Sequence, residues 1–128
     1  MFSKEERSTF GYWFAHWCAF QMTALNLKVW RLKYLCHDIS KPWLRLFLSY
    51  EKVQKIHRKH SKHHIEYKNP EKIDWMSMVI DWECSRFTKQ ASPLNAREEF
   101  NQRIYHGNKK EVKLLLDNFL PIINKLKI

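Results

Sequence analysis

The sequence predicts an all-α protein, built as one compact domain over residues 1–128 in a bundle of about six helices. Apolar residues recur at helical spacing along nearly the whole chain, and no alternating strand pattern competes with them. Only two Gly and four Pro occur, too few for a turn-rich β-sandwich or barrel. Hydrophobic residues make up 45% of the chain, which excludes intrinsic disorder.

The first half of the chain predicts three helices. Ser3 and Glu6 have the spacing of a capping box, and aromatic residues at helix-face spacing continue from Phe10 towards Leu27. A second helix is expected over residues 27–36, ending before Pro42 because proline disfavours the α conformation in the preceding residue. A third helix is expected from residue 43 to residue 60 or 64.

The second half predicts three more helices. Asn69 and Pro70 mark the start of one whose apolar positions form a narrow buried stripe. The stripe consists of Ile73, Met76, Ile80, Cys84 and Phe87. Ser92–Pro93 open the next helix, which runs to about residue 105. Asn108 and Glu111 have the spacing of a cap for the last helix, and Pro121 is expected to kink or shorten it.

Charge and cysteine content limit the classes of function. The chain carries 23 Lys and Arg against 13 Asp and Glu, a net charge of +10 that favours nucleotides, nucleic acid or another anionic partner. The three cysteines form no CxxC pair, so neither a disulfide framework nor a thiolate zinc knuckle is indicated. Neither a signal peptide nor an apolar run of about eighteen residues is present, so we expect a soluble cytoplasmic protein without membrane contact.

Several ionisable residues lie on or beside apolar helix faces, where a buried charge needs a partner. His16 borders the aromatic face of the first helix, His37–Asp38 close the second, and Asp81 edges the buried stripe. His57, His60 and His64 share one face of the third helix if that helix extends far enough. Taken singly, these residues fit core histidines, an ion-paired aspartate or a solvated basic face. Together they offer the nitrogen and oxygen ligands of a metal site in a bundle core.

The order of these residues resembles the HD-domain superfamily of metal-dependent phosphohydrolases. More narrowly, it resembles a short, poorly characterised HD-like family of phages and bacteria, defined by three motifs. Here the motifs are His37-Asp38-Ile39-Ser40-Lys41, a histidine-rich segment from His57 to Glu66 containing His63-His64, and Asp81-Trp82 leading to Arg86. The resemblance covers about residues 10–105 and implies an intracellular protein, in a bacterial host if it is phage-encoded.

The resemblance implies a site for one or two divalent ions, with Mn, Fe, Co, Ni, Zn and Mg all open. The first ion would be held by His16, His37, Asp38 and Asp81. Asp38 would bridge to a second ion held by His57 and by His63 or His64, with His60 as a substitute.

The resemblance also implies which groups act on the substrate. Asp38 would serve catalysis as the bridging ligand, while Lys41 binds phosphate as a point charge. Arg86 could hold phosphate oxygens in a bidentate manner, but it lies about 140° from Asp81 on the helix wheel, so a direct role requires the helix to fray there. Otherwise Arg86 is a surface residue. Lys89 is a further substrate-binding candidate.

The expected function is therefore hydrolysis of a nucleotide or other phosphoester by metal-activated water. A different class of function stays open: a basic helical protein that binds nucleic acid or a host protein and has a structural or degenerate metal site. A structural zinc site without turnover is a third alternative. Substrate, metal and oligomeric state are not determined by the sequence.

Overall fold

The structure is a computed structural model that describes residues 3, 5–88 and 94–128. Its described part is all-α, as predicted, and contains six α-helices if residues 109–126 are counted as one. The α-helices are α1 (Phe10–Asn26), α2 (Ser40–Arg45), α3 (Tyr50–His60), α4 (Trp75–Ser85), α5 (Ala96–His106), α6 (Lys109–Leu114) and α7 (Leu120–Leu126). Short 3₁₀ turns cover Glu5–Ser8, Leu32–Cys36 and Pro70–Lys72, and a π-helical segment, Leu115–Phe119, joins α6 to α7.

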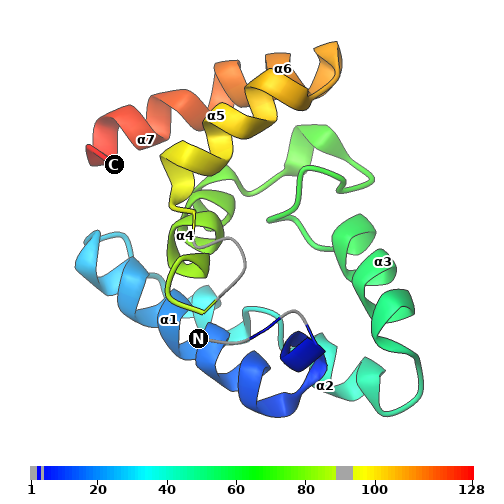
Figure 1. The fold of residues 1–128 in the computed structure, drawn as a ribbon. Helices are drawn as coiled ribbons and strands as arrows, with labels where there is room; N and C mark the ends of the chain where they lie inside the picture. The colour runs from blue at the N-terminus through cyan, green and yellow to red at the C-terminus, as the bar shows by residue number, and fades with distance from the viewer. Residues whose placement is uncertain (1–2, 4, 89–93) are drawn as a thin grey trace.

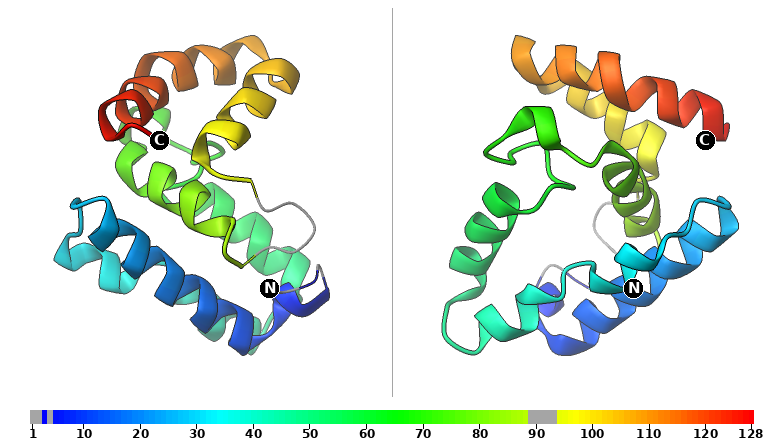
Figure 2. Two further views of the ribbon diagram at one scale, coloured as in Figure 1. Left: turned by 60° about the vertical axis from the view of Figure 1, so that its left-hand side comes forward. Right: turned by 180° about the vertical axis from the view of Figure 1, so that it is seen from behind.

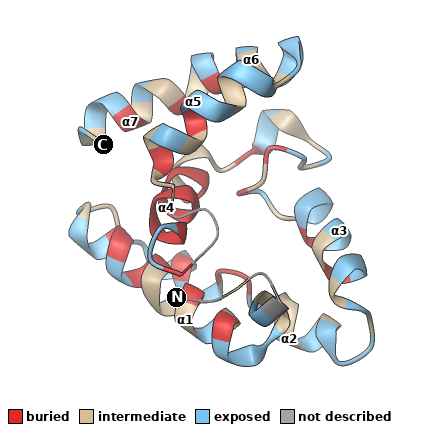
Figure 3. Ribbon diagram, viewed as in Figure 1, coloured by how far each residue is buried: buried red, intermediate tan, exposed pale blue. Residues whose placement is uncertain are grey.

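Helix α4 lies at the centre of the molecule. Figure 1 shows α1 on one side of it and, on the other, α5 with the C-terminal helix, the name used here for α6, Leu115–Phe119 and α7 together. Figure 2 shows the same arrangement from two further directions. Every residue from 77 to 85 is buried, which Figure 3 shows as a nearly continuous red helix. The predicted single stripe is therefore too narrow, and Phe87, its last member, is 55% exposed.

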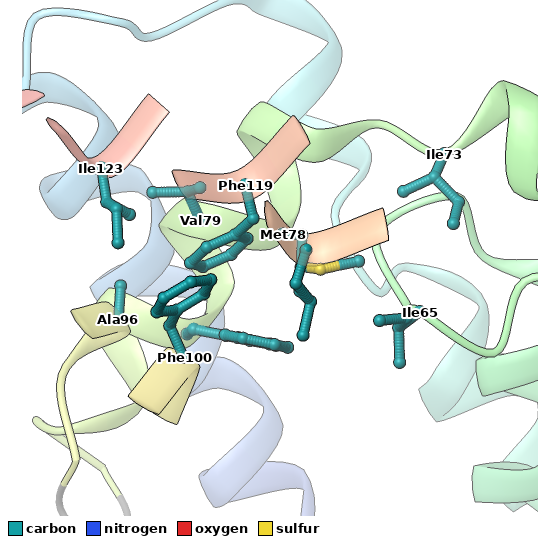
Figure 4. Close-up of a cluster of buried hydrophobic side chains, with 10 residues drawn as sticks. Ile65, Ile73, Met78, Val79, Ala96, Phe100, Phe119 and Ile123 are labelled. Carbon is teal, nitrogen blue, oxygen red and sulfur yellow. The ribbon is translucent and has the colours of Figure 1, made fainter. Parts of the chain in front are cut away.

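Two apolar clusters pack against opposite sides of α4. One joins α4 to the C-terminal helices through the stacked rings of Phe100 and Phe119, whose centroids are 5.8 Å apart (Figure 4). The other joins α4 to α1 and contains Phe20, Tyr34 and Ile80. Because α4 is packed on both sides, it is a fixed platform for any polar side chain that it carries.

The helix expected over residues 27–36 is wrong. Helix α1 continues to Asn26, and Lys28 then adopts a left-handed conformation with φ of 60°. Val29 N donates to Ala24 O and Lys28 N to Leu25 O, the hydrogen-bond pattern of a Schellman motif, which ends the helix. Only Leu32–Cys36 coil again, as a 3₁₀ turn.

The helix expected from residue 43 is two helices. Pro42 does not end a helix but lies in the first turn of α2, where its missing N–H costs no hydrogen bond. Residues 46–49 separate α2 from α3, and the Ser49 side chain caps α3 by accepting from Lys52 N. Helix α3 ends at His60, so His63 and His64 belong to the loop that follows.

The helix starts in the C-terminal third follow their caps. Asn108 caps α6 through Glu111 N, as predicted, and Asn95 forms a capping box with Glu98 at the start of α5. The predicted opening at Ser92–Pro93 lies outside the described residues. Pro121 follows the π-helical segment, in which Leu120 N donates to Leu115 O. The widened turn keeps the helix continuous where proline cannot donate a hydrogen bond.

Among the described residues, no helix combines the length and the apolar character needed to cross a lipid bilayer.

Candidate metal centre

The residues predicted as metal ligands come together from five parts of the chain. Helices α1, α3 and α4 supply His16, His57 and Asp81, and two loops supply His37–Asp38 and His63–His64. All of them are buried except His64, which is partly buried. They form two groups whose candidate ligand atoms lie within 4.8 Å of one another. The first group is His16, His37, Asp38 and Asp81, and the second is His57, His63 and His64.

The first group is centred on one oxygen of Asp81. His16 Nε2 lies 2.8 Å and His37 Nε2 3.2 Å from Asp81 Oδ1. The two imidazole nitrogens are themselves 3.3 Å apart. Two Nε2 atoms and a carboxylate oxygen therefore converge on a small volume from α1, α4 and the turn at residue 37.

The second group brings imidazoles together from α3 and the loop that follows. His57 Nε2 lies 3.1 Å from His63 Nε2. His64 Nε2 is buried and has no hydrogen-bond partner in the described part of the chain. The rings of His57 and His64 are 4.8 Å apart between centroids and nearly perpendicular. This group therefore holds a buried nitrogen whose lone pair or proton is unsatisfied.

Asp38 lies between the two groups and turns one oxygen towards each. Its Oδ2 is 3.7 Å from His16 Nε2 and 3.5 Å from His37 Nε2. Its Oδ1 is 2.8 Å from His57 Nε2 and 3.0 Å from His63 Nε2. Neither short contact has the alignment of a hydrogen bond, so Asp38 Oδ1 is a buried acceptor without a hydrogen-bond partner among the described residues.

These donors fit a divalent cation. Two orphaned polar atoms, Asp38 Oδ1 and His64 Nε2, are buried in the cluster, and an unsatisfied buried polar atom normally costs about 1–3 kcal/mol. A cation would satisfy the oxygen and the imidazole lone pairs together. Imidazole nitrogens with carboxylate oxygens are a donor set that several first-row transition metals accept. The buried His and Asp groups could therefore hold a metal ion.

Both aspartates are held in the ionised form. Burial raises the pKa of Asp38, but His37, Lys41, His57 and His63 outweigh this effect and hold it well below its usual range. Burial likewise raises the pKa of Asp81, and the neighbouring His16 and His37 bring it well below the usual range. The site therefore keeps two buried carboxylates in the ionised form, which is the form that binds metal ions.

Most of the imidazoles are held neutral. Burial lowers the pKa of His37 to about 4 and that of His64 to about 2, against the opposing effect of the aspartates. Burial also lowers the pKa of His57. For His63, burial acts in the same direction, but the close, negatively charged Asp38 carboxylate prevails and raises its pKa. Neutral imidazole is the form that binds metal ions.

Three side chains of α1 fasten the loop that carries His37 and Asp38. Trp13 Nε1 donates to Asp38 O at 2.8 Å, Trp17 Nε1 to Leu35 O at 3.0 Å, and Gln21 Nε2 to Tyr34 O at 2.6 Å. The donors are spaced four residues apart, so they lie along one face of α1. We call these three residues the α1 clamp. His16 is also on α1, so one helix positions ligands on two chain segments.

The outer nitrogens of two imidazoles also have partners. His57 Nδ1 lies 3.0 Å from Ser61 Oγ, and His16 Nδ1 lies 3.9 Å from Cys84 Sγ. Such contacts fix the orientation of an imidazole ring and would leave its Nε2 available to a metal ion.

A cavity of about 230 Å³ opens on the cluster at Asp38, His64 and Asp81. Sequence reasoning missed two of its cationic residues, Arg7 and Arg58. Arg7 Nε is buried and lacks a hydrogen-bond partner among the described residues, as expected of a group that binds an anion. Arg58 follows His57 directly on α3, which is a weak sequence signal, whereas Arg7 lies outside every motif.

The remaining predicted residues have separate positions. Lys41 lies at the cluster, with Nζ 3.2 Å from Asp38 Oδ2. Helix α4 ends at Ser85, but Arg86 pairs with Glu83 at 3.3 Å and stacks on Phe87, so its substrate role stays a prediction. His60 is exposed at the end of α3 and belongs to neither ligand group. Lys89 lies outside the described residues.

Comparison of the chain with protein-family models, curated proteins and solved structures gave no match.

Proposed function

We propose that the protein is a metal-dependent phosphohydrolase acting on a nucleotide or another phosphoester. The observation that carries the proposal is the position of Asp38, which turns one carboxylate oxygen to each of two histidine groups. A single buried carboxylate so placed could bridge two cations. The sequence resemblance to HD-domain proteins points to the same chemistry.

The chain's own residues would bind and orient the phosphate. When bound, divalent cations would supply Lewis acidity and lower the pKa of a coordinated water. Arg7, Lys41 and Arg58 line the cavity beside the cluster and would hold the negative phosphoryl oxygens. Lys41 now neutralises Asp38 Oδ2, and a cation at that oxygen would release the ammonium group for the substrate.

The proposal is tested by metal content and hydrolysis in matched aspartate variants. The protein is purified without oxygen, loaded with each candidate metal, and analysed for bound metal and for hydrolysis of a panel of phosphomonoesters. Asp38→Asn and Asp81→Asn should lose bound metal and reduce hydrolysis by at least about 100-fold. Asp117→Asn, at an exposed residue of the C-terminal helix, is the control and should change neither.

Two results would contradict the proposal. Wild-type protein that binds no divalent ion under any loading condition would exclude the metal centre. Tightly bound metal with no turnover of any phosphoester would instead indicate a structural zinc site.

A second candidate function is nucleic-acid binding, which the exposed basic residues of α3 favour. Lys52, Lys55, Arg58 and Lys59 are exposed on this helix. Binding through them should weaken steeply with salt, and a Lys55→Glu, Lys59→Glu variant should bind less tightly. Asp38→Asn should leave such binding intact, which separates this function from hydrolysis.

A further inference from the structure

A second cavity, of about 380 Å³, meets the metal centre at His16, Asp38 and Lys41. Its volume falls within the range of small-molecule sites, about 300–1,000 Å³. Aromatic residues form much of its wall, and Leu46 and Val53 add aliphatic surface. The aromatic residues are Phe10, Tyr12, Trp13, Trp43 and Tyr50. We call this space the apolar cavity.

Several polar side chains in the wall of the apolar cavity have partners within the protein, whereas Arg7, which lines both cavities, has an Nε without a hydrogen-bond partner among the described residues. The Thr9 hydroxyl donates to Glu6 O at 2.7 Å and accepts from Tyr12 N. Gln54 Nε2 donates to the Tyr50 hydroxyl at 2.6 Å, and an Arg45 nitrogen donates to Leu48 O at 3.1 Å. These groups are already hydrogen-bonded, so they offer little to the polar edge of a ligand.

The apolar character continues from the interior to the mouth. Val53 is 2% exposed inside, whereas Phe10, Trp43 and Leu46 are 66%, 68% and 71% exposed at the rim. At the opposite end, the cavity reaches Asp38 and the ammonium group of Lys41. The cavity thus has a charged inner end at the metal centre and a hydrocarbon body leading outwards.

We propose that the apolar cavity binds a hydrocarbon group attached to the phosphate, so that the substrate is a phosphoester of an apolar alcohol or phenol. This inference rests on the proposed function for the position of the phosphate. An alkyl chain and an aromatic ring would both fit this cavity, because binding either one removes apolar surface from water.

A nucleoside fits this cavity less well than a hydrocarbon. The ribose hydroxyls would lose water, and the hydrogen-bonded Thr9, Tyr50 and Gln54 would not replace it, while Arg7 is assigned to the phosphate under the proposed function. A hydrocarbon of similar size loses no hydrogen bond. The structure therefore favours apolar esters over nucleotides.

The test measures binding of a phosphonate series by calorimetry, in metal-loaded and in metal-free protein. Phosphonates are not hydrolysed, so the result does not depend on turnover. From methylphosphonate through butylphosphonate to hexylphosphonate, Kd should fall by roughly three- to fourfold per methylene. The Kd of benzylphosphonate, compared with that of hexylphosphonate, shows whether the cavity prefers an aromatic ring or an alkyl chain. Adenosine monophosphate should bind more weakly than hexylphosphonate.

Matched surface variants locate the effect. Trp43→Ser and Phe10→Ser should flatten the dependence of Kd on chain length and leave methylphosphonate binding unchanged. Phe47→Ser and Phe14→Ser are the controls, because these residues are 84% and 51% exposed and are not among the described residues that line the apolar cavity. They should keep the wild-type dependence.

The outcomes separate this inference from the proposed function. A steep chain-length dependence without hydrolysis of any phosphoester would support the cavity assignment and count against the phosphohydrolase. Hydrolysis with a Kd independent of chain length would overturn the cavity assignment alone. Tighter binding of adenosine monophosphate than of hexylphosphonate would also overturn it, as would equal effects of Phe47→Ser and Trp43→Ser.

Discussion

Asp74, at the residue scale, combines a helix cap with an ion pair. Its Oδ1 accepts a hydrogen bond from Ser77 N at the start of α4, and its Oδ2 lies 2.6 Å from Lys33 Nζ. Burial raises the pKa of Asp74, but Lys33 and Ser77 lower it overall from its ordinary value of 3.8. The ionised carboxylate therefore stabilises the folded state.

Asp74→Asn should lower the free energy of unfolding at pH 7 by about 0.5–1 kcal/mol. Asparagine keeps the oxygen that caps the helix, so the loss of unfolding free energy measures the contribution of the negative charge. Because the folded-state pKa lies below the unfolded one, the charge contributes above about pH 4, and its contribution disappears as pH falls through the folded value. Urea unfolding of both proteins between pH 7 and pH 2.5 measures this. A difference that stays constant with pH would contradict it.

The sequence predicted the members of the buried His/Asp cluster better than the cationic residues that line the cavity beside it. His37, Asp38 and Asp81 belong to motifs whose residue types and spacing indicate metal binding before any fold is known. Arg7 and Arg58 carry no such pattern, because an arginine that lines a cavity differs from a surface arginine only in what packs beside it. Helix packing, which brings Arg7 beside the cluster, is a tertiary property that local spacing does not encode.

At the scale of elements, the α1 clamp holds the chain segment that carries His37 and Asp38 against α1. Trp13→Phe removes the donor to Asp38 O and should weaken metal binding about 10- to 100-fold, as loss of an outer-sphere contact does. Trp17→Phe removes the same chemical group opposite Leu35 O, two residues before His37, and should weaken metal binding less than Trp13→Phe does. Competition with a chromogenic chelator measures both affinities. Equal losses in the two variants would show that the clamp acts only through general stability.

The C-terminal helix fixes α4 from the side opposite α1. Phe119 is fully buried, with its ring centroid 4.6 Å from that of Trp82, so Phe119→Ala should cost about 3–5 kcal/mol. Leu116→Ala, at a residue 44% exposed on the same helix, should cost less than about 1 kcal/mol. Denaturant unfolding of the two variants gives both values. Similar costs would mean that the buried ring is not a major part of this core.

The start of α6 was predictable from its side-chain cap, whereas the Ser49 cap of α3 was missed and the elements shaped by tertiary contacts were not predictable. The start of α6 follows from Asn108, which is visible in the sequence. Helix α1 ends at Asn26 because Lys28 adopts the left-handed conformation. Lys28 is not glycine, so the sequence gives no sign of this end. The break between α2 and α3 likewise contains neither glycine nor proline, so the helical spacing of apolar residues continues across it without a sign of the interruption.

At the scale of the whole molecule, the candidate metal centre lies between chain segments that share few other contacts. Helix α3 packs mainly on α2, and its His57 contacts Asp38, which in turn lies beside His16 of α1. A cation would therefore cross-link α3 to the central helices. The C-terminal helices pack on α4 through their own apolar cluster and do not depend on the cation.

Removal of metal should accordingly loosen one half of the molecule. Amide hydrogen exchange should become faster in residues 36–41 and 50–64 after chelation, and stay unchanged in residues 96–126. Mass spectrometry of metal-loaded and chelated protein provides the comparison. A uniform change along the chain would show that the centre stabilises the fold as one unit.

The backbone of residue 38 restricts which amino acid can stand there. Its φ is 55°, in the left-handed region that glycine, asparagine and aspartate adopt most readily. Of these three, only aspartate brings an anionic oxygen. Glutamate has the charge but resists the turn, and asparagine accepts the turn but lacks the charge. Stereochemistry and coordination chemistry therefore select the same residue independently, and little room is left for substitution at this one position.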